Sequence, residues 1–172
     1  ARGQNVSMYL EDIERIRQLK YRYFRGIDTA DIELLRGVLA EDVHIDYHGG
    51  TYRWQVEGRE AMLASIAAAF NEYAVACHTG HHPEIEVLTP TSATGIWYLT
   101  DVFINLREKL VTTGSALYRD EYVKQADGWR IKSSTYKRLY EIQEALESAP
   151  KLTAHYLANA AGREAIARAT TR

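Results

Sequence analysis

Two kinds of hydrophobic periodicity divide this chain, and their order restricts the folds open to it. Apolar residues recur every three or four positions from Ile13 to Ile27, which predicts an amphipathic helix over residues 9–27. A short repeat after Asp31 and an alanine-rich stretch over residues 59–72 predict two further helices. The second half alternates instead, as strands do. Helices grouped early and strands grouped late indicate an α+β domain.

Six segments are expected as strands, and glycine-containing turns at Gly49–Gly50 and Asp127–Gly128 join two pairs of them as hairpins. The segments are 43–47, 52–56, 84–88, 93–104, 111–124 and 129–140. Residues 93–104 are apolar on both faces, so we expect both sides of that strand to be covered. Residues 141–147 are expected to be helical, and Pro150 to end that helix.

This order of elements predicts a cone-shaped α+β barrel. A curved, mixed and mostly antiparallel sheet would wrap around the long N-terminal helix and leave an apolar hollow. The domain is expected to span residues 9–149. Residues 1–8 are expected to be a disordered lead-in or a remnant of cloning. Residues 150–172 are expected to form a partly helical tail that covers the mouth of the hollow or packs on a partner chain.

Composition excludes several classes of partner. The formal net charge is −2, and no apolar run approaches the roughly 20 residues that span a bilayer, so neither nucleic acid nor a membrane is expected. The single cysteine, Cys77, forms no internal disulfide and fits a cytoplasmic location. Twelve tyrosines suit a pocket for a large apolar ligand with a few oxygens, or else lie on sheet surfaces.

Three histidines within residues 78–82 form the densest chemical feature of the sequence. A metal site needs three or four converging ligands, and no second cluster of histidine or cysteine accompanies them, so no metal is expected. A histidine on this loop serves better as a general base, because its pKa lies near working pH. The alternative is that loop histidines are simply solvated, which we favour for His81 and His82.

Asp101 interrupts an otherwise apolar strand, in line with Leu99 and Phe103. A buried carboxylate requires a partner, and a histidine whose tautomer it fixes is a natural one. The alternative is a carboxylate at a strand end that reaches solvent.

Tyr23 continues the buried face of the first helix, and Asp28 follows where that helix breaks. Asp28 either faces the hollow or caps the next helix, for which Asp31 is an equally good candidate. Arg138 alternates with Tyr136 on the last strand and would hold a ligand oxygen or pair with an acid.

Four segments match a known family in order and spacing: YFRGID at 23–28, HTGHHPEI at 78–85, ATGIWYLTD at 93–101 and YKRLYE at 136–141. They resemble the SnoaL-like branch of the nuclear transport factor two-like superfamily, and within it the bile-acid 7α-dehydratases. The similarity runs over about residues 13–144, and the segment 40–75 departs from it. The resemblance implies the α+β cone and a site formed by His78, Asp101, Tyr23, Asp28, Arg138, Trp97 and Tyr136.

The activity implied by this resemblance is dehydration of a hydroxylated 3-oxo-4-ene steroid or a bile-acid-like polycyclic substrate. His78 would remove a proton, Asp101 would orient His78, and Tyr23 and Asp28 would act on the oxygens of the substrate. Arg138, Trp97 and Tyr136 would bind the substrate. No cofactor is required, because the enone is the electron sink, and a homodimer or homotrimer is expected.

Two other functions fit the same residues. A ketosteroid-type isomerase or a polyketide cyclase would use the same pocket with a different outcome. A non-catalytic small-molecule-binding module would keep the pocket but would not need a buried acid–base pair.

Overall fold

The structure, a computed structural model, describes residues 9–159. Within that part the elements follow the expected order: α2 (Leu10–Asp28), α3 (Ile32–Arg36), β1 (Leu39–His48), β2 (Arg53–Glu57), α4 (Arg59–Ala69), β3 (Ala74–Thr89), β4 (Ser92–Asn105), β5 (Leu110–Gln125) and β6 (Gly128–Ala145). Strand β1 is longer than expected, and the expected strand near residue 84 begins ten residues earlier. The α+β class is confirmed.

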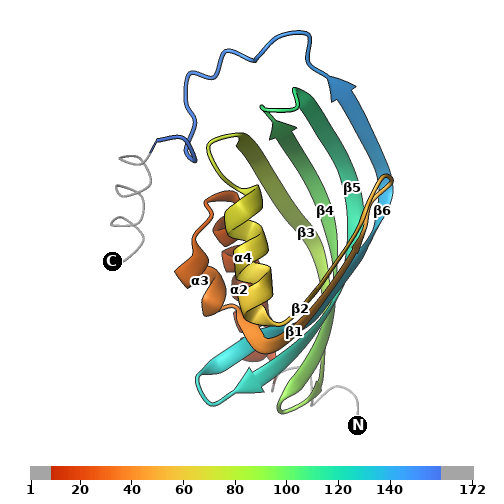
Figure 1. Ribbon diagram of the computed structural model, residues 1–172. Helices are drawn as coiled ribbons and strands as arrows, with labels where there is room; N and C mark the ends of the chain where they lie inside the picture. Colours follow the sequence, from red (N-terminus) through yellow and green to blue (C-terminus); the bar gives the residue numbers. More distant parts are fainter. Residues whose placement is uncertain (1–8, 160–172) are drawn as a thin grey trace.

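The strands form one curved sheet with the order β2-β1-β6-β5-β4-β3. Only the β1–β6 pair is parallel, and the other pairs are antiparallel. Figure 1 shows that α2, α3 and α4 all lie on the concave side of this sheet, which curls around them without closing. The mixed, mostly antiparallel sheet around the N-terminal helix is therefore as the sequence predicts.

The apolar face of α2 packs into this curve. Ile16, Leu19, Tyr23 and Ile27 are at most 4% exposed. The helix ends at Asp28, and Asp31 caps the next helix by accepting a hydrogen bond from the Leu34 backbone N–H at 3.0 Å. Because Asp31 fills this role, the carboxylate of Asp28 is left for other contacts.

The histidine segment is a strand and not a loop, so that expectation is wrong. It belongs to β3, which lies at the edge of the sheet and pairs with β4 over most of its length. The register shifts between His81 and Glu84, and His82 has a φ of 51°. Proline lacks the N–H that a ladder needs, so an edge strand with a bulge accommodates Pro83.

The helix expected over residues 141–147 is also wrong, because β6 continues to Ala145. Its last residues pair with β5 in a register from Gly114↔Glu141 to Leu110↔Ala145. Their helical propensity yields to a long hairpin partner, which is a tertiary effect. Residues 146–159 then arch beyond the β4–β5 turn toward the helices, without a helix in residues 150–159. The expectations for residues 1–8 and 160–172 lie outside the described residues.

Strand β4 is covered on one face only, so the expectation of two covered faces is wrong for the single chain. Trp97, Leu99 and Asp101 point inward and are at most 5% exposed, whereas Tyr98 and Val102 on the other face are each 38% exposed. The helices supply apolar cover on the concave side alone (Figure 1).

Gly80 determines how closely α2 approaches β3. A Cβ at this position would lie 2.1 Å from the ring of Phe24, which is buried. Phe24 and Asp28 are one helical step of four residues apart, about 6 Å, and Gly80 and His78 are two strand residues apart, about 6.6 Å. Because the two spacings match, Phe24 can pack on Gly80 at the same time as Asp28 contacts His78.

We expect Gly80→Ala to destabilise the fold by about 1–3 kcal/mol, because the Phe24 ring cannot move aside without shifting α2. This corresponds to a fall in Tm of roughly 2–12 °C for a domain of this size. Thermal unfolding followed by circular dichroism measures it. The matched control is Gly37→Ala, where the nearest atom to an added Cβ lies 3.5 Å away. Equal Tm values for the two variants would contradict this account.

Candidate active site

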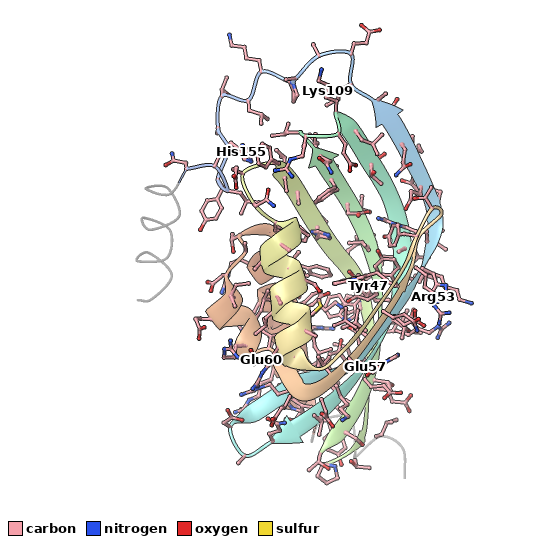
Figure 2. The ribbon with its side chains drawn as sticks, in the orientation of Figure 1. Tyr47, Arg53, Glu57, Glu60, Lys109 and His155 are labelled. Atoms are coloured by element: carbon pink, nitrogen blue, oxygen red, sulfur yellow. The ribbon has the colours of Figure 1, made fainter. Side chains whose placement is uncertain are left out.

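A cavity of about 490 Å³ lies between the concave face of the sheet and the helices α2 and α4. Five tyrosines contribute to its wall: Tyr23, Tyr47, Tyr52, Tyr118 and Tyr136. Apolar side chains also line it: Ile66 of α4, Phe70 at the C-cap of α4, and Leu99 and Phe103 of β4. In Figure 2 Tyr47 lies between the sheet and α4, while Arg53 on the neighbouring strand points outward. The volume is in the range that holds a drug-sized ligand.

His78 and Asp28 form an acid–base pair at this cavity. The His78 Nδ1 atom lies 2.5 Å from Asp28 Oδ1, and the His78 backbone N–H donates to Asp28 Oδ2 at 2.9 Å. Both side chains are largely buried, and His78 lines the cavity. A carboxylate on Nδ1 favours the tautomer with a proton there, which leaves Nε2 with a free lone pair. This is the arrangement of a general base.

The expected pairing of His78 with Asp101 is therefore wrong, although the two residues are direct partners in the β3–β4 register. Asp101 instead accepts two hydrogen bonds from Arg138, from Nη1 and, at 2.8 Å, from Nη2. A guanidinium fork matches a carboxylate in two places, so it outcompetes an imidazole for this position.

Arg138 lies between two carboxylates. Its Nε atom is 3.3 Å from Glu141 Oε2, and the side chains of all three residues are less than 10% exposed. Burial alone would lower the pKa of Arg138, but its hydrogen bonds to Asp101 raise that pKa above the usual value. Gly114 on β5 permits the contact between β4 and β6, because a Cβ there would lie 3.1 Å from Arg138 Nη1. Arg138 is thus neutralised by the protein itself.

The tyrosines of the cavity contact one another. The rings of Tyr47 and Tyr136 stack with their centroids 4.2 Å apart, and Tyr118 packs edge-on against both. The hydroxyls of Tyr52 and Tyr136 are hydrogen-bonded. Burial raises the pKa of Tyr23 and of Tyr136 above the ordinary value, so both remain neutral phenols at neutral pH.

One expected substrate contact is not found at the cavity. Trp97 is completely buried and is not part of the cavity wall; its Nε1–H donates to the Tyr122 hydroxyl at 2.9 Å. Its strand position is inward, as predicted, but the inner face of β4 is longer than the cavity. Trp97 therefore belongs to the packed core. His78, Asp101, Tyr23, Tyr136 and Arg138 do line the cavity, and Asp28 contacts it through His78.

Sequence reasoning missed a buried ion pair behind the tyrosines. Lys20 Nζ lies 2.7 Å from Asp120 Oδ2, and both side chains are 0% exposed. A signal for Lys20 was available, because its spacing of four from Ile16 and three from Tyr23 places it on the apolar face of α2. The sequence around Asp120 gave no such signal, since charged residues at alternate positions also occur on exposed strands.

Two findings on other classes of site concern the described residues only. Among residues 9–159, no three histidine, cysteine, aspartate or glutamate side chains converge as metal ligands. In the same part of the chain, no helix is long and apolar enough to cross a membrane.

A curled sheet around one long helix, with a cavity that holds a His–Asp pair, places the chain among the small α+β cone folds. A family model described as the SnoaL-like domain matches residues 8–135. The chain belongs to that family.

Solved structures share the fold. A candidate scytalone dehydratase from Novosphingobium aromaticivorans is 16% identical, covers 87% of this chain and 99% of its own, and has a TM-score of 0.72. A hexachlorocyclohexane dehydrochlorinase, LinA type 2, is also 16% identical, with coverage of 83% and 97% and a TM-score of 0.70. A protein of unknown function from Mycobacterium tuberculosis is 24% identical, with coverage of 96% and 90% and a TM-score of 0.64.

Proposed function

We propose that this chain is a cofactor-independent lyase that removes water from a hydroxylated polycyclic ketone held in the cavity. The observation that carries the proposal is the His78–Asp28 pair at the wall of a largely apolar, tyrosine-rich cavity. Such a pair supplies a proton-accepting nitrogen without a metal or an organic group. The similarity in fold to a candidate dehydratase and a dehydrochlorinase supports an elimination, because both names describe loss of a small molecule HX.

The substrate class that fits best is a 7-hydroxy-3-oxo-4-ene steroid. Its C6 proton is acidic, because the negative charge left behind delocalises through the double bond to the 3-oxo oxygen. His78 Nε2 takes this proton, and Asp28 stabilises the imidazolium that results. The bond between carbon and the hydroxyl oxygen then breaks, and the hydroxide leaves as water once it receives a proton.

The other expected residues take modified roles. Arg138 and Asp101 shape the cavity wall as a neutralised pair and do not offer a free cation to an anionic substrate. Tyr136 borders the cavity and would contact an oxygen of the substrate, whereas the side chain of Tyr23 is 0% exposed and forms part of the wall. The apolar side chains of the cavity wall, including Phe70 and Phe103, would pack against the ring system.

The test is incubation with a panel of 3-oxo-4-ene steroids that differ in the position and stereochemistry of one hydroxyl. A dehydratase gives new conjugated-dienone absorbance and a product lighter by one water. His78→Ala should lose about 10²–10⁴-fold in kcat while folding normally. A product of unchanged mass indicates an isomerase, and tight binding without turnover indicates a binding module. Either result contradicts the proposal.

A further inference from the structure

The cavity wall holds a pair of polar side chains that the elimination above does not use. Thr112 on β5 and Gln143 on β6 both line the cavity, close to the apolar side chains of Phe103 and Leu110. Thr112 and Gln143 are direct partners in the β5–β6 register, and Gln143 Nε2 lies 3.4 Å from Thr112 Oγ1. Thr112 is half-buried and Gln143 is exposed, so a ligand in the cavity can reach both members of this Thr112–Gln143 pair.

A count of protons shows what this pair offers to a ligand. The amide of Gln143 carries two N–H protons, and the hydroxyl of Thr112 carries one. The hydrogen bond between the two side chains uses one of these three protons, whichever side chain donates. Within residues 9–159 neither group makes another side-chain hydrogen bond. Two donor protons are therefore left for an acceptor on a ligand.

Several other polar groups of the wall already have partners. The guanidinium of Arg138 donates to Asp101 and lies against Glu141. The hydroxyls of Tyr52 and Tyr136 bond to each other, which uses one of their two protons. A ligand oxygen that needs two donors side by side therefore finds them at the Thr112–Gln143 pair.

The register of the sheet sets the spacing between this pair and the base. His78, Asp101 and Gly114 are successive partners across β3, β4 and β5, and Phe103 and Thr112 are partners two residues further along. The backbone of Thr112 is therefore offset from that of His78 by about 6.6 Å along the strands and about 9.6 Å across them. Both side chains point to the concave face of a curved sheet, so their polar atoms lie closer together than their backbones.

A ligand with an acidic C–H and a conjugated carbonyl oxygen fits this spacing. In the proposed substrate the 3-oxo oxygen is four bonds from C6, and the contacts at the two ends add about 3 Å each. Other polar groups of the wall lie further away along the strands. Asn105 is four residues from Asp101 in one direction, and Tyr136 lies in the row of Trp97, four residues away in the other direction. Each offset is about 13 Å, twice that of Thr112.

We propose that Thr112 and Gln143 bind the carbonyl oxygen of the substrate and stabilise the negative charge that forms on it when His78 removes the proton. This inference rests on the proposed function and adds an orientation to it. The carbonyl end of the ligand faces the β4–β5 turn, which Lys109 marks in Figure 2. The pair selects an oxygen that accepts two hydrogen bonds, as a ketone does.

The reaction places charge at this pair. His78 Nε2 takes the C6 proton, and the electron pair of the broken C–H bond moves through the double bond to the carbonyl oxygen. The O–H of Thr112 and the N–H of Gln143 bond more strongly to this negative oxygen than to the neutral ketone. The electron pair then returns, the bond between C7 and the hydroxyl oxygen breaks, and the proton on His78 leaves with that oxygen as water. No other reactant is consumed.

The experiment compares two ligands that differ only in the 3-oxo group, androst-4-ene-3,17-dione and androst-4-en-17-one. Neither has a hydroxyl to lose, so binding is measured without elimination, by equilibrium dialysis. The measured quantity is the affinity for the dione divided by the affinity for the monoketone. Thr112→Val and Gln143→Leu should each lower this ratio about three- to tenfold relative to wild type, which is what one neutral hydrogen bond contributes.

Two further variants and one spectrum separate hydrogen bonding from packing. Thr112→Ser keeps the hydroxyl and should keep the ratio. Thr113→Val is the matched control, because Thr113 is the next residue of β5 and pairs with Val102 on the opposite, exposed face of the sheet. The infrared stretch of the dione, labelled with carbon-13 at C3, should move to higher frequency in Thr112→Val and Gln143→Leu but not in Thr113→Val. A change in packing alone would not move it.

A kinetic measurement applies once a steroid of the panel is turned over. Thr112→Val and Gln143→Leu should each lower kcat by at least about tenfold, and by a larger factor than they raise KM, because the charge on the oxygen forms only in the transition state. The loss is expected to be smaller than the roughly 10²–10³-fold of an enclosed oxyanion donor, because water also reaches the exposed Gln143.

The inference is overturned if Thr112→Val and Thr113→Val give the same ratio, or if wild type binds neither steroid. It is also overturned if Tyr136→Phe lowers the ratio while Thr112→Val retains it, because the carbonyl would then lie at the tyrosine end of the cavity. The binding measurements need no turnover. A failed dehydration test with the expected change in ratio removes the proposed reaction and leaves the carbonyl site, whereas turnover with an unchanged ratio removes the carbonyl site alone.

Discussion

The Asp28→Asn variant should lose about 10²–10⁴-fold in kcat for water elimination, the range that general-base catalysis contributes. An amide in place of the carboxylate can donate its N–H to His78 Nδ1, which favours the tautomer with the proton on Nε2. The nitrogen that remains free for a ligand would then carry a proton and could not take one from the substrate. Steady-state kinetics on whichever steroid of the panel is turned over measures the loss.

Nitrogen-15 NMR of the histidines gives a readout that does not depend on substrate: His78 should change from the Nδ1–H to the Nε2–H tautomer. Asp101→Asn is the matched control, because it removes a neighbouring carboxylate that contacts Arg138 instead. That variant should lose stability but keep the tautomer of His78. An equal loss of kcat in both variants, with no change in tautomer, would show that Asp28 does not direct the base.

Replacing Lys20 by methionine should lower stability by about 3–5 kcal/mol, because Asp120 is then left buried without a counter-charge. In a chain of this length the fall in Tm is roughly 6–20 °C. Lys20 is completely buried, and its Nζ also lies 3.7 Å from the centroid of the Tyr118 ring, so a cation–π contact is lost too. Chemical denaturation with urea measures the change.

Lys124→Met provides the comparison, because Lys124 Nζ lies at a nearly equal distance, 2.8 Å, from Asp12 but the lysine is 31% exposed. Solvent screens that pair, and its loss should change stability by less than about 1 kcal/mol. If the two variants lose similar amounts, the Lys20–Asp120 pair does not act as a desolvated ion pair.

Local patterns predicted the elements of this fold well where one periodicity was strong. The spacing of apolar residues placed α2 within a residue of its observed ends, and Asp127–Gly128 correctly marked the β5–β6 hairpin. The prediction of secondary structure was less accurate where a segment has no single hydrophobic periodicity. Residues 141–145 look helical by themselves, yet they pair with β5 because that strand offers them a ladder of hydrogen bonds.

The histidine segment misled for a related reason. Glycine and proline at Gly80 and Pro83 are typical of loops, but here each meets a tertiary requirement of an edge strand. Gly80 lets Phe24 lie against the backbone, and the bulge before Glu84 accommodates the proline. Neither feature can be predicted from the residues that flank Gly80 and Pro83 in the sequence.

The sequence by itself determined the α+β class, the order of the elements and the residue types of the site, because periodicity and short motifs are local properties. Only the tertiary structure decided which carboxylate meets which base: Asp28 lies on His78, and Asp101 on Arg138. That choice depends on the approach of α2 to β3 and on the gap that Gly114 leaves across β5. Hydrogen bonds act over about 3 Å, whereas the residues that compete for them are dozens of positions apart in the chain.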